Sequence, residues 1–76
     1  MIDRNELIEV IALALDCPTA SINFESGLGH HLNWDSLGHL CIMGALEDRY
    51  KIEINENNIT KMLTVRDISE YLENNI

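Results

Sequence analysis

The sequence predicts an all-α protein, a four-helix bundle of three longer helices and one short helix with a long first loop. Three segments repeat apolar residues at helical spacing, and cap-forming residues precede each of them. Such stripes are buried most simply by packing helices against one another. Ile52 and Ile54 alternate around Glu53, but no other segment offers them a partner strand. A chain of 76 residues predicts a single domain over residues 1–76.

The first helix is predicted over residues 4–15. Asp3 and Glu6 have the spacing of a capping box. The apolar stripe behind them consists of Leu7, Val10, Ile11 and Ala14. Pro18 cannot continue a helix, so the segment Asp16-Cys17-Pro18 is expected to end it.

Residues 18–34 show no sustained period, which predicts a long loop. Gly27, Gly29 and Asn33 favour turns. We expect four scattered apolar side chains to pin this loop to the bundle: Phe24, Leu28, Leu32 and Trp34.

Residues 35–51 form the second predicted helix, which Asp35 or Asn33 could cap. At about 100° per residue, one face carries His39, Met43, Leu46 and Tyr50. The opposite face carries Leu37, Cys41, Gly44 and Asp48.

A short helix is expected around residues 56–62, and Thr64 begins a last helix that ends near Asn74-Asn75. The stripe of that last helix is Val65, Ile68, Tyr71 and Leu72.

The chain is acidic, with 13 acidic and 5 basic side chains and a formal net charge of −8. This charge argues against nucleic acid and anionic membrane surfaces as partners. It favours proteins with basic docking patches, or it simply keeps a small protein in solution. Cys17 and Cys41 predict no disulfide framework, and no signal peptide or membrane-inserting segment is evident. We therefore expect a cytoplasmic location and a monomer.

The segment from Trp34 to Leu40, Trp-Asp-Ser-Leu-Gly-His-Leu, resembles the Asp-Ser-Leu motif of acyl and peptidyl carrier proteins. The motif lies near mid-chain at a helix start, after a long loop, as in that family. The run from Ile42 to Tyr50 is similar to the family's second helix. Ile54 and Val65 fall where the family has core residues. The resemblance extends along nearly the whole chain.

This resemblance implies a carrier, not an enzyme. It implies that a phosphopantetheinyl transferase attaches 4'-phosphopantetheine to Ser36, and that acyl or aminoacyl groups are held there as thioesters. Asp35 would help to position the transferase's metal, and Leu37 would contact partner enzymes. A helix start also favours a phosphate, by about 0.3–1 kcal/mol at an exposed site. The alternative is that Ser36 is only a residue of an ordinary helix cap.

The predicted partner-binding face comprises Leu37, Cys41, Gly44, Glu47 and Asp48. Gly38 and Gly44 leave its early part without charge, unlike many carriers of fatty acid synthesis. One hypothesis is that these glycines let a partner approach closely; the alternative is drift on a tolerant surface. The departure favours a specialised pathway, such as surface polysaccharide or secondary metabolite assembly.

An acyl chain could shelter in the interior, with the lining residues Leu46, Ile54, Ile59 and Met62; the alternative is an ordinary filled core. His39 could touch the arm or bond to loop backbone, and Trp34 could seal the loop. The spacing of the three histidines predicts no metal site.

Cargo and pathway stay open among fatty acid, polyketide, surface-polysaccharide and nonribosomal peptide synthesis. The rival functions are an aminoacyl or peptidyl carrier and a helical interaction module that is never modified.

Overall fold

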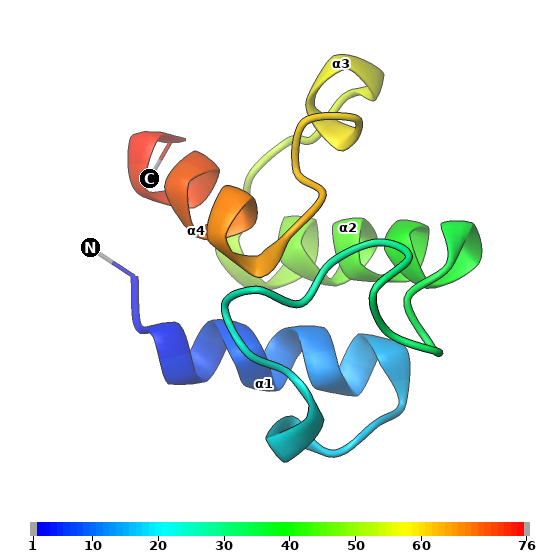
Figure 1. The fold of residues 1–76 in the computed structure, drawn as a ribbon. Coiled ribbons are helices and arrows are strands. Elements are labelled where there is room, and N and C mark those ends of the chain that lie inside the picture. The colour runs from blue at the N-terminus through cyan, green and yellow to red at the C-terminus, as the bar shows by residue number, and fades with distance from the viewer. Residues whose placement is uncertain (1, 76) are drawn as a thin grey trace.

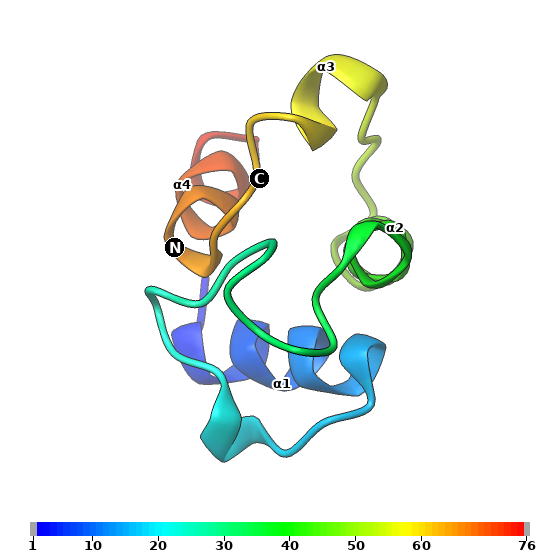
Figure 2. The ribbon, with the colours of Figure 1, turned by 45° about the vertical axis from the view of Figure 1, so that its right-hand side comes forward.

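A computed structural model describes residues 2–75, and its helices confirm the predicted bundle (Figure 1). In chain order they are α1 (Arg4–Leu15), a 3-10 turn η1 (Thr19–Ser21), α2 (Ser36–Tyr50), α3 (Glu56–Ile59) and α4 (Val65–Asn75). Figure 2 views α2 nearly end-on at the right, with α1 crossing below, α4 at the left and α3 above. The long loop between η1 and α2 passes through the space that these helices enclose (Figure 2).

α1 begins where predicted, because the Asp3 side chain accepts hydrogen bonds from the backbone N–H groups of Asn5 and Glu6. It ends one residue before Asp16, which adopts the left-handed conformation with φ 55°. The Asp16 and Cys17 N–H groups then bond back to Leu13 and Ala12. This left-handed cap therefore closes the helix before the chain reaches Pro18.

The core lies between α1, α2, α4 and the loop. Trp34 is its largest fully buried side chain, so the loop contributes the bulkiest piece of the interior. Burial of each large aliphatic or aromatic side chain stabilises the fold by about 1.5–3 kcal/mol. The buried apolar residues are Leu7, Ile11, Ala12, Leu15, Ile22, Trp34, Ile42, Met43, Leu46, Met62, Val65, Ile68 and Leu72.

The loop is held to the segment before α4 by an isolated antiparallel bridge at Gly27 and Thr64. Leu28 N–H donates to the Leu63 carbonyl at 2.8 Å, and Val65 N–H donates to the Ser26 carbonyl at 2.9 Å. A Cβ on Gly27 would lie 2.5 Å from the Leu63 oxygen, so only glycine permits this approach. The bridge joins parts of the chain that are far apart in sequence.

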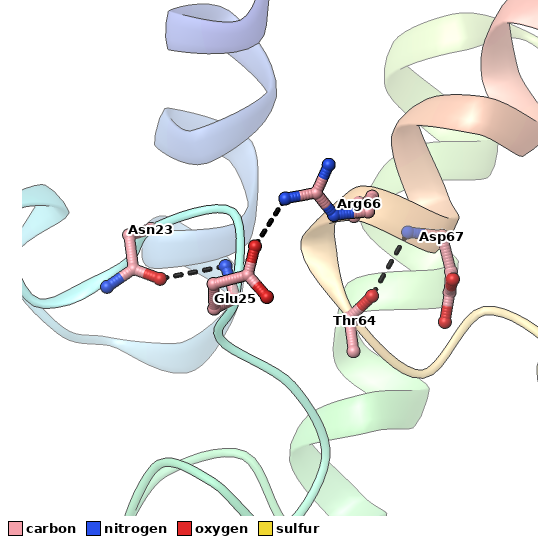
Figure 3. A network of polar contacts seen from close by, with 5 residues as sticks. All are labelled: Asn23, Glu25, Thr64, Arg66 and Asp67. Carbon is pink, nitrogen blue, oxygen red and sulfur yellow. Dashed lines mark hydrogen bonds and ion pairs between the residues drawn. The ribbon is translucent and has the colours of Figure 1, made fainter.

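A surface network reinforces the same junction (Figure 3). Arg66 pairs with the Glu25 carboxylate, and the Asn23 side chain orders that turn by accepting from Glu25 N–H at 2.8 Å. Thr64 caps α4 by accepting from Asp67 N–H at 3.1 Å. The ion pair is exposed, so solvent screens the attraction between its two charges. Its main effect is to orient the loop.

Two details differ from the expectations. Leu32 was predicted to pin the loop, but its side chain is 98% exposed, whereas Trp34 is buried and Phe24 and Leu28 are partly buried. The polar Asn33 side chain holds this turn instead, by donating from Nδ2 to the Leu15 carbonyl at 3.0 Å. The prediction for Leu32 was therefore wrong.

The short helix also ends earlier than predicted. α3 stops at Ile59, where Thr60 Oγ1 turns back to bond the Asn57 carbonyl at 3.1 Å. The turn that follows returns the chain to the core and buries Met62. Residues 52–55 form no strand, as expected.

Candidate functional site

Ser36 is the first residue of α2 and is exposed. Asp35 is the N-cap: its Oδ1 accepts from Gly38 N–H at 2.8 Å, and its carbonyl accepts from His39 N–H at 2.8 Å. The first turn of α2 contains no acidic side chain. Because the cap residue is Asp35, the Ser36 hydroxyl is not needed to start the helix. A negatively charged group on that hydroxyl would lie at the positive end of the helix dipole.

The other three serines of the chain are placed differently. Ser26 and Ser69 are buried. Ser21 is exposed, but its hydroxyl donates to the Pro18 carbonyl at 2.7 Å and lies 3.2 Å from His31 Nε2. Ser36 is therefore the exposed serine at the start of a long helix.

Gly38 lies on the packed side of α2, against the loop. A Cβ there would come within 2.3 Å of the Asn33 carbonyl oxygen and 2.9 Å of Leu15 Cδ2. The interpretation of Gly38 as part of an open docking face was therefore wrong, since the molecule's own loop occupies that space. At Gly44 a Cβ would meet nothing within 4 Å, so this position is open.

Trp34, His39 and Ile59 form a hydrogen-bonded chain beneath Ser36. Trp34 Nε1–H donates to His39 Nδ1 at 3.0 Å, and His39 Nε2 lies 3.1 Å from the Ile59 carbonyl oxygen. An indole N–H can only donate, so Nδ1 is the acceptor and Nε2 carries the proton that bonds Ile59. The two rings are stacked at 6.1 Å between centroids and 24° between planes. The expectation that Trp34 seals the loop is confirmed, since its side chain is fully buried. His39 does bond to a backbone carbonyl, but that carbonyl belongs to α3 and not to the loop as expected.

A largely apolar groove of about 290 Å³ opens beside Ser36. We call it the Ser36 groove, and its lining residues are Leu28, Ser36, His39, Leu40, Ile59, Thr60 and Leu63. Of the four residues predicted to line an acyl pocket, only Ile59 is among them. Leu46 and Met62 are fully buried in the core, and Ile54 is partly buried.

Leu28, Leu40 and Leu63 were missed by sequence reasoning. Leu40 could have been found, because it follows the motif by one helical turn and flanks the inward face. Leu28 and Leu63 are brought together by the bridge between the loop and the segment before α4, and no local sequence pattern predicts that pairing. Two of the seven residues that line the groove are therefore brought there by a long-range contact.

The residues predicted to bind partners lie mostly on the surface. Leu37 is 71% exposed, and Cys41, Gly44 and Asp48 are exposed. Glu47 is only partly exposed, because its Oε2 accepts from Ile54 N–H at 2.9 Å and holds the connection to α3.

A second surface pocket, of about 390 Å³, is lined by the two chain neighbours of Ser36, Asp35 and Leu37, and also by Cys41 and the exposed Leu32. The exposed Leu32 and Leu37 side chains lie in this pocket together with the polar residues Asp35 and Asn33. A surface of this kind is suited to contact with other proteins.

The remaining polar residues do not assemble a metal site within residues 2–75, where no group of three potential ligands occurs. His31 orders the loop: its Nδ1 accepts from Asn33 N–H at 3.1 Å. Both nitrogens of His39 are also used internally. Cys17 and Cys41 are free thiols. None of the helices described is long and apolar enough to cross a membrane.

An exposed serine at a capped helix start, beside an apolar groove on a small helical bundle, is the arrangement expected of a domain that carries a tethered group. A sequence model of the family described as "Phosphopantetheine attachment site" matches residues 5–72. The chain is similar to acyl carrier protein 3 of Ralstonia nicotianae, with 33% identity over 91% of this chain and 79% of that protein. It is 29% identical to the acyl carrier protein of Phaeodactylum tricornutum over 91% of each chain. The chain belongs to the acyl carrier protein family.

Family membership establishes a carrier role and not an enzymatic one. The group carried by the family is 4'-phosphopantetheine. The geometry fits it, since Ser36 is exposed and the helix start can accept a phosphate. The adjacent apolar groove can receive a flexible arm. Phosphopantetheinyl transferases and acyl-handling enzymes are the partners that the family implies.

Proposed function

We propose that Ser36 is the attachment residue for 4'-phosphopantetheine and that the arm holds acyl groups as thioesters for partner enzymes. The observation that carries this proposal is the position of Ser36. It is exposed at the first residue of α2, while Asp35 independently caps the helix. Its hydroxyl can therefore be modified without disturbing the fold.

The neighbouring residues support roles in recognition. Asp35 stays exposed although one oxygen caps α2, so it can help to position the transferase's metal. Leu37 offers an apolar contact at the same helix start. The proposed partner face is Leu37, Cys41, Gly44, Glu47 and Asp48, and Glu47 contributes to it mainly by fixing the turn after α2.

The partners that we propose are enzymes with basic docking patches, because the net charge of −8 attracts them. The open, uncharged surface at Cys41 and Gly44 supports a specialised pathway over general fatty acid synthesis. We place the carrier in the cytoplasm as a monomer. An aminoacyl or peptidyl cargo is the alternative within the same class.

Mass spectrometry tests the attachment. The unmodified protein is incubated with coenzyme A, Mg²⁺ and a permissive phosphopantetheinyl transferase, and its intact mass is measured. The wild type should gain one phosphopantetheine and Ser36→Ala none. Ser21→Ala is the matched control, because Ser21 is the other exposed serine and should not affect loading. Failure of the wild type to gain mass would indicate an unmodified interaction module instead.

A further inference from the structure

The route from Ser36 into the core passes His39. On the inward side of α2, Ser36, His39 and Met43 follow one another at successive turns. The His39 side chain is buried, with only 5% of its surface exposed. Leu46 lies further along the same helix and is completely buried. A group on Ser36 would therefore reach the His39 imidazole before it reached the apolar interior.

The imidazole is fixed from both sides. Trp34, which belongs to the loop, donates to Nδ1, and Nε2–H donates to the Ile59 carbonyl at the end of α3. His39 therefore ties the loop, α2 and α3 together at the floor of the Ser36 groove. Displacing it would leave the Trp34 N–H and both imidazole nitrogens without partners in an apolar environment, which proteins avoid.

We propose that this Trp34–His39–Ile59 connection closes the interior and restricts the cargo to short acyl groups held in the Ser36 groove. The proposal rests on the proposed function, because it assumes an arm on Ser36. The groove of about 290 Å³ has to receive part of the arm as well as the cargo. A long acyl chain cannot be buried there completely, and its distal carbons stay in water at an unfavourable free energy. His39 is thus a positioning residue that determines cargo length.

The test uses three acylated forms of the full-length protein. Butanoyl-, octanoyl- and dodecanoyl-coenzyme A serve as donors for the permissive transferase, which transfers the acylated arm to Ser36. Intact mass first shows whether loading occurs. Absence of loading from coenzyme A itself contradicts the proposed function, whereas the cargo proposal is judged only on protein that has gained the expected mass.

Methyl NMR then reports where the acyl group lies. Resonances of Leu28, Leu40 and Leu63 should shift on acylation, because these residues line the groove. Resonances of Leu46 and Met62 should stay unchanged from butanoyl to dodecanoyl. Hydroxylamine should cleave all three thioesters at the same rate. Shifts of Leu46 and Met62 that grow with chain length, together with slower cleavage of the dodecanoyl form, would overturn the proposal.

Two amide substitutions at His39 distinguish the effect of its hydrogen bond to Ile59 from the effect of its packing. His39→Gln can place a donor near the Nε2 position and keep the bond to Ile59, so its interior should stay closed to dodecanoyl. His39→Asn can accept from Trp34 but is too short to reach Ile59. Its dodecanoyl form should shift Leu46 and Met62, and hydroxylamine cleavage should slow several-fold. Identical behaviour of the two variants would contradict a role of the His39–Ile59 hydrogen bond in closing the interior. The wild-type measurements decide the proposal even if one variant does not fold.

Discussion

Gly38 and Gly44 lie on the same helix and are the same residue type, yet their surroundings are opposite. At Gly38 the space for a side chain is filled by the Asn33 carbonyl and Leu15, whereas at Gly44 that space is open. Gly38 is therefore required by the molecule's own packing. Gly44 is not required by packing within the molecule, and only contact with a partner protein could require glycine there.

The difference shows that α2 has one side closed by the loop and another left free. On the closed side, Trp34, Asn33 and His39 connect the loop to α1, α2 and α3. On the free side, Cys41 and Gly44 are exposed. Ser36 lies at the first turn of α2, between these two sides. Its neighbours are therefore the buried His39 on one side and the exposed Leu37 on the other.

Trp34→Phe should have the largest effect, because it removes the anchor of the closed side. The variant loses the donor to His39 Nδ1 and part of the buried volume, which together should destabilise the fold by about 3 kcal/mol. Urea unfolding followed by circular dichroism measures this change. Leu32→Ala, in the same loop but exposed, is the control and should stay within about 0.5 kcal/mol of the wild type. Equal effects of the two substitutions would show that the loop is not anchored by Trp34.

Gly38→Ala should come next. Alanine improves helix propensity by about 1 kcal/mol, but the clash with the Asn33 backbone should cost about 3 kcal/mol. The net result should be a loss of about 2 kcal/mol in the free energy of unfolding, measured by urea unfolding. The loop should also lose its bond from Asn33 to Leu15, with shifted amide resonances at both residues. A variant as stable as the wild type would mean that the loop is free to move away from α2.

The helices themselves could be predicted from sequence, since their signals are local. The Asp3 cap, the stripe of Leu7 and Ile11 and the motif around Ser36 each depend on residues within about two turns. The closed side of α2 could not be predicted, because it is created by the loop. A helical projection places Gly38 between the inward and outward faces of α2, and only the path of the loop shows that Gly38 is packed while Gly44 is open.

The site divides in the same way. Ser36 and Asp35 could be found from a short motif. The hydrogen bond at the floor of the groove could not be predicted, because His39 bonds to the carbonyl of a residue 20 positions away. Every residue has such a carbonyl, so the side-chain pattern does not show which one is used. Leu28 and Leu63 likewise meet only through the bridge at Gly27 and Thr64. Features that depend on backbone contacts between distant segments are invisible to residue patterns.

Gly44→Ala should have the opposite sign to Gly38→Ala. Since nothing lies within 4 Å of the new Cβ, the helix propensity of alanine should stabilise the protein by about 1 kcal/mol. Urea unfolding checks the stability, and transfer of phosphopantetheine to Ser36 should be unchanged. Slower transfer by a partner enzyme in spite of this stabilisation would indicate that the partner approaches the helix backbone there. A loss of stability would contradict the description of this face as open.

The smallest effect is expected at Tyr50, at the far end of α2 from Ser36. Its hydroxyl is buried and has no hydrogen-bond partner among residues 2–75. Burial, with a smaller contribution from the nearby Glu6 carboxylate, raises the pKa of Tyr50 above its ordinary value, while Arg49 opposes this shift. The unfolded chain therefore loses this proton first as the pH rises past about 10. The ionisation should lower the stability of the folded state above that pH and have no effect below it.

Tyr50→Phe should remove this alkaline loss. At neutral pH the variant should be as stable as the wild type or about 0.5 kcal/mol more stable, because an unpaired buried hydroxyl is deleted. Thermal unfolding of both proteins from about pH 8 to about pH 11 measures the difference, which should widen in favour of the variant above about pH 10. A difference that is constant over this range would mean that Tyr50 titrates alike in the folded and unfolded states. A destabilised variant at neutral pH would mean that the hydroxyl has a partner, and that this end of α2 is held by a polar contact as the Ser36 end is.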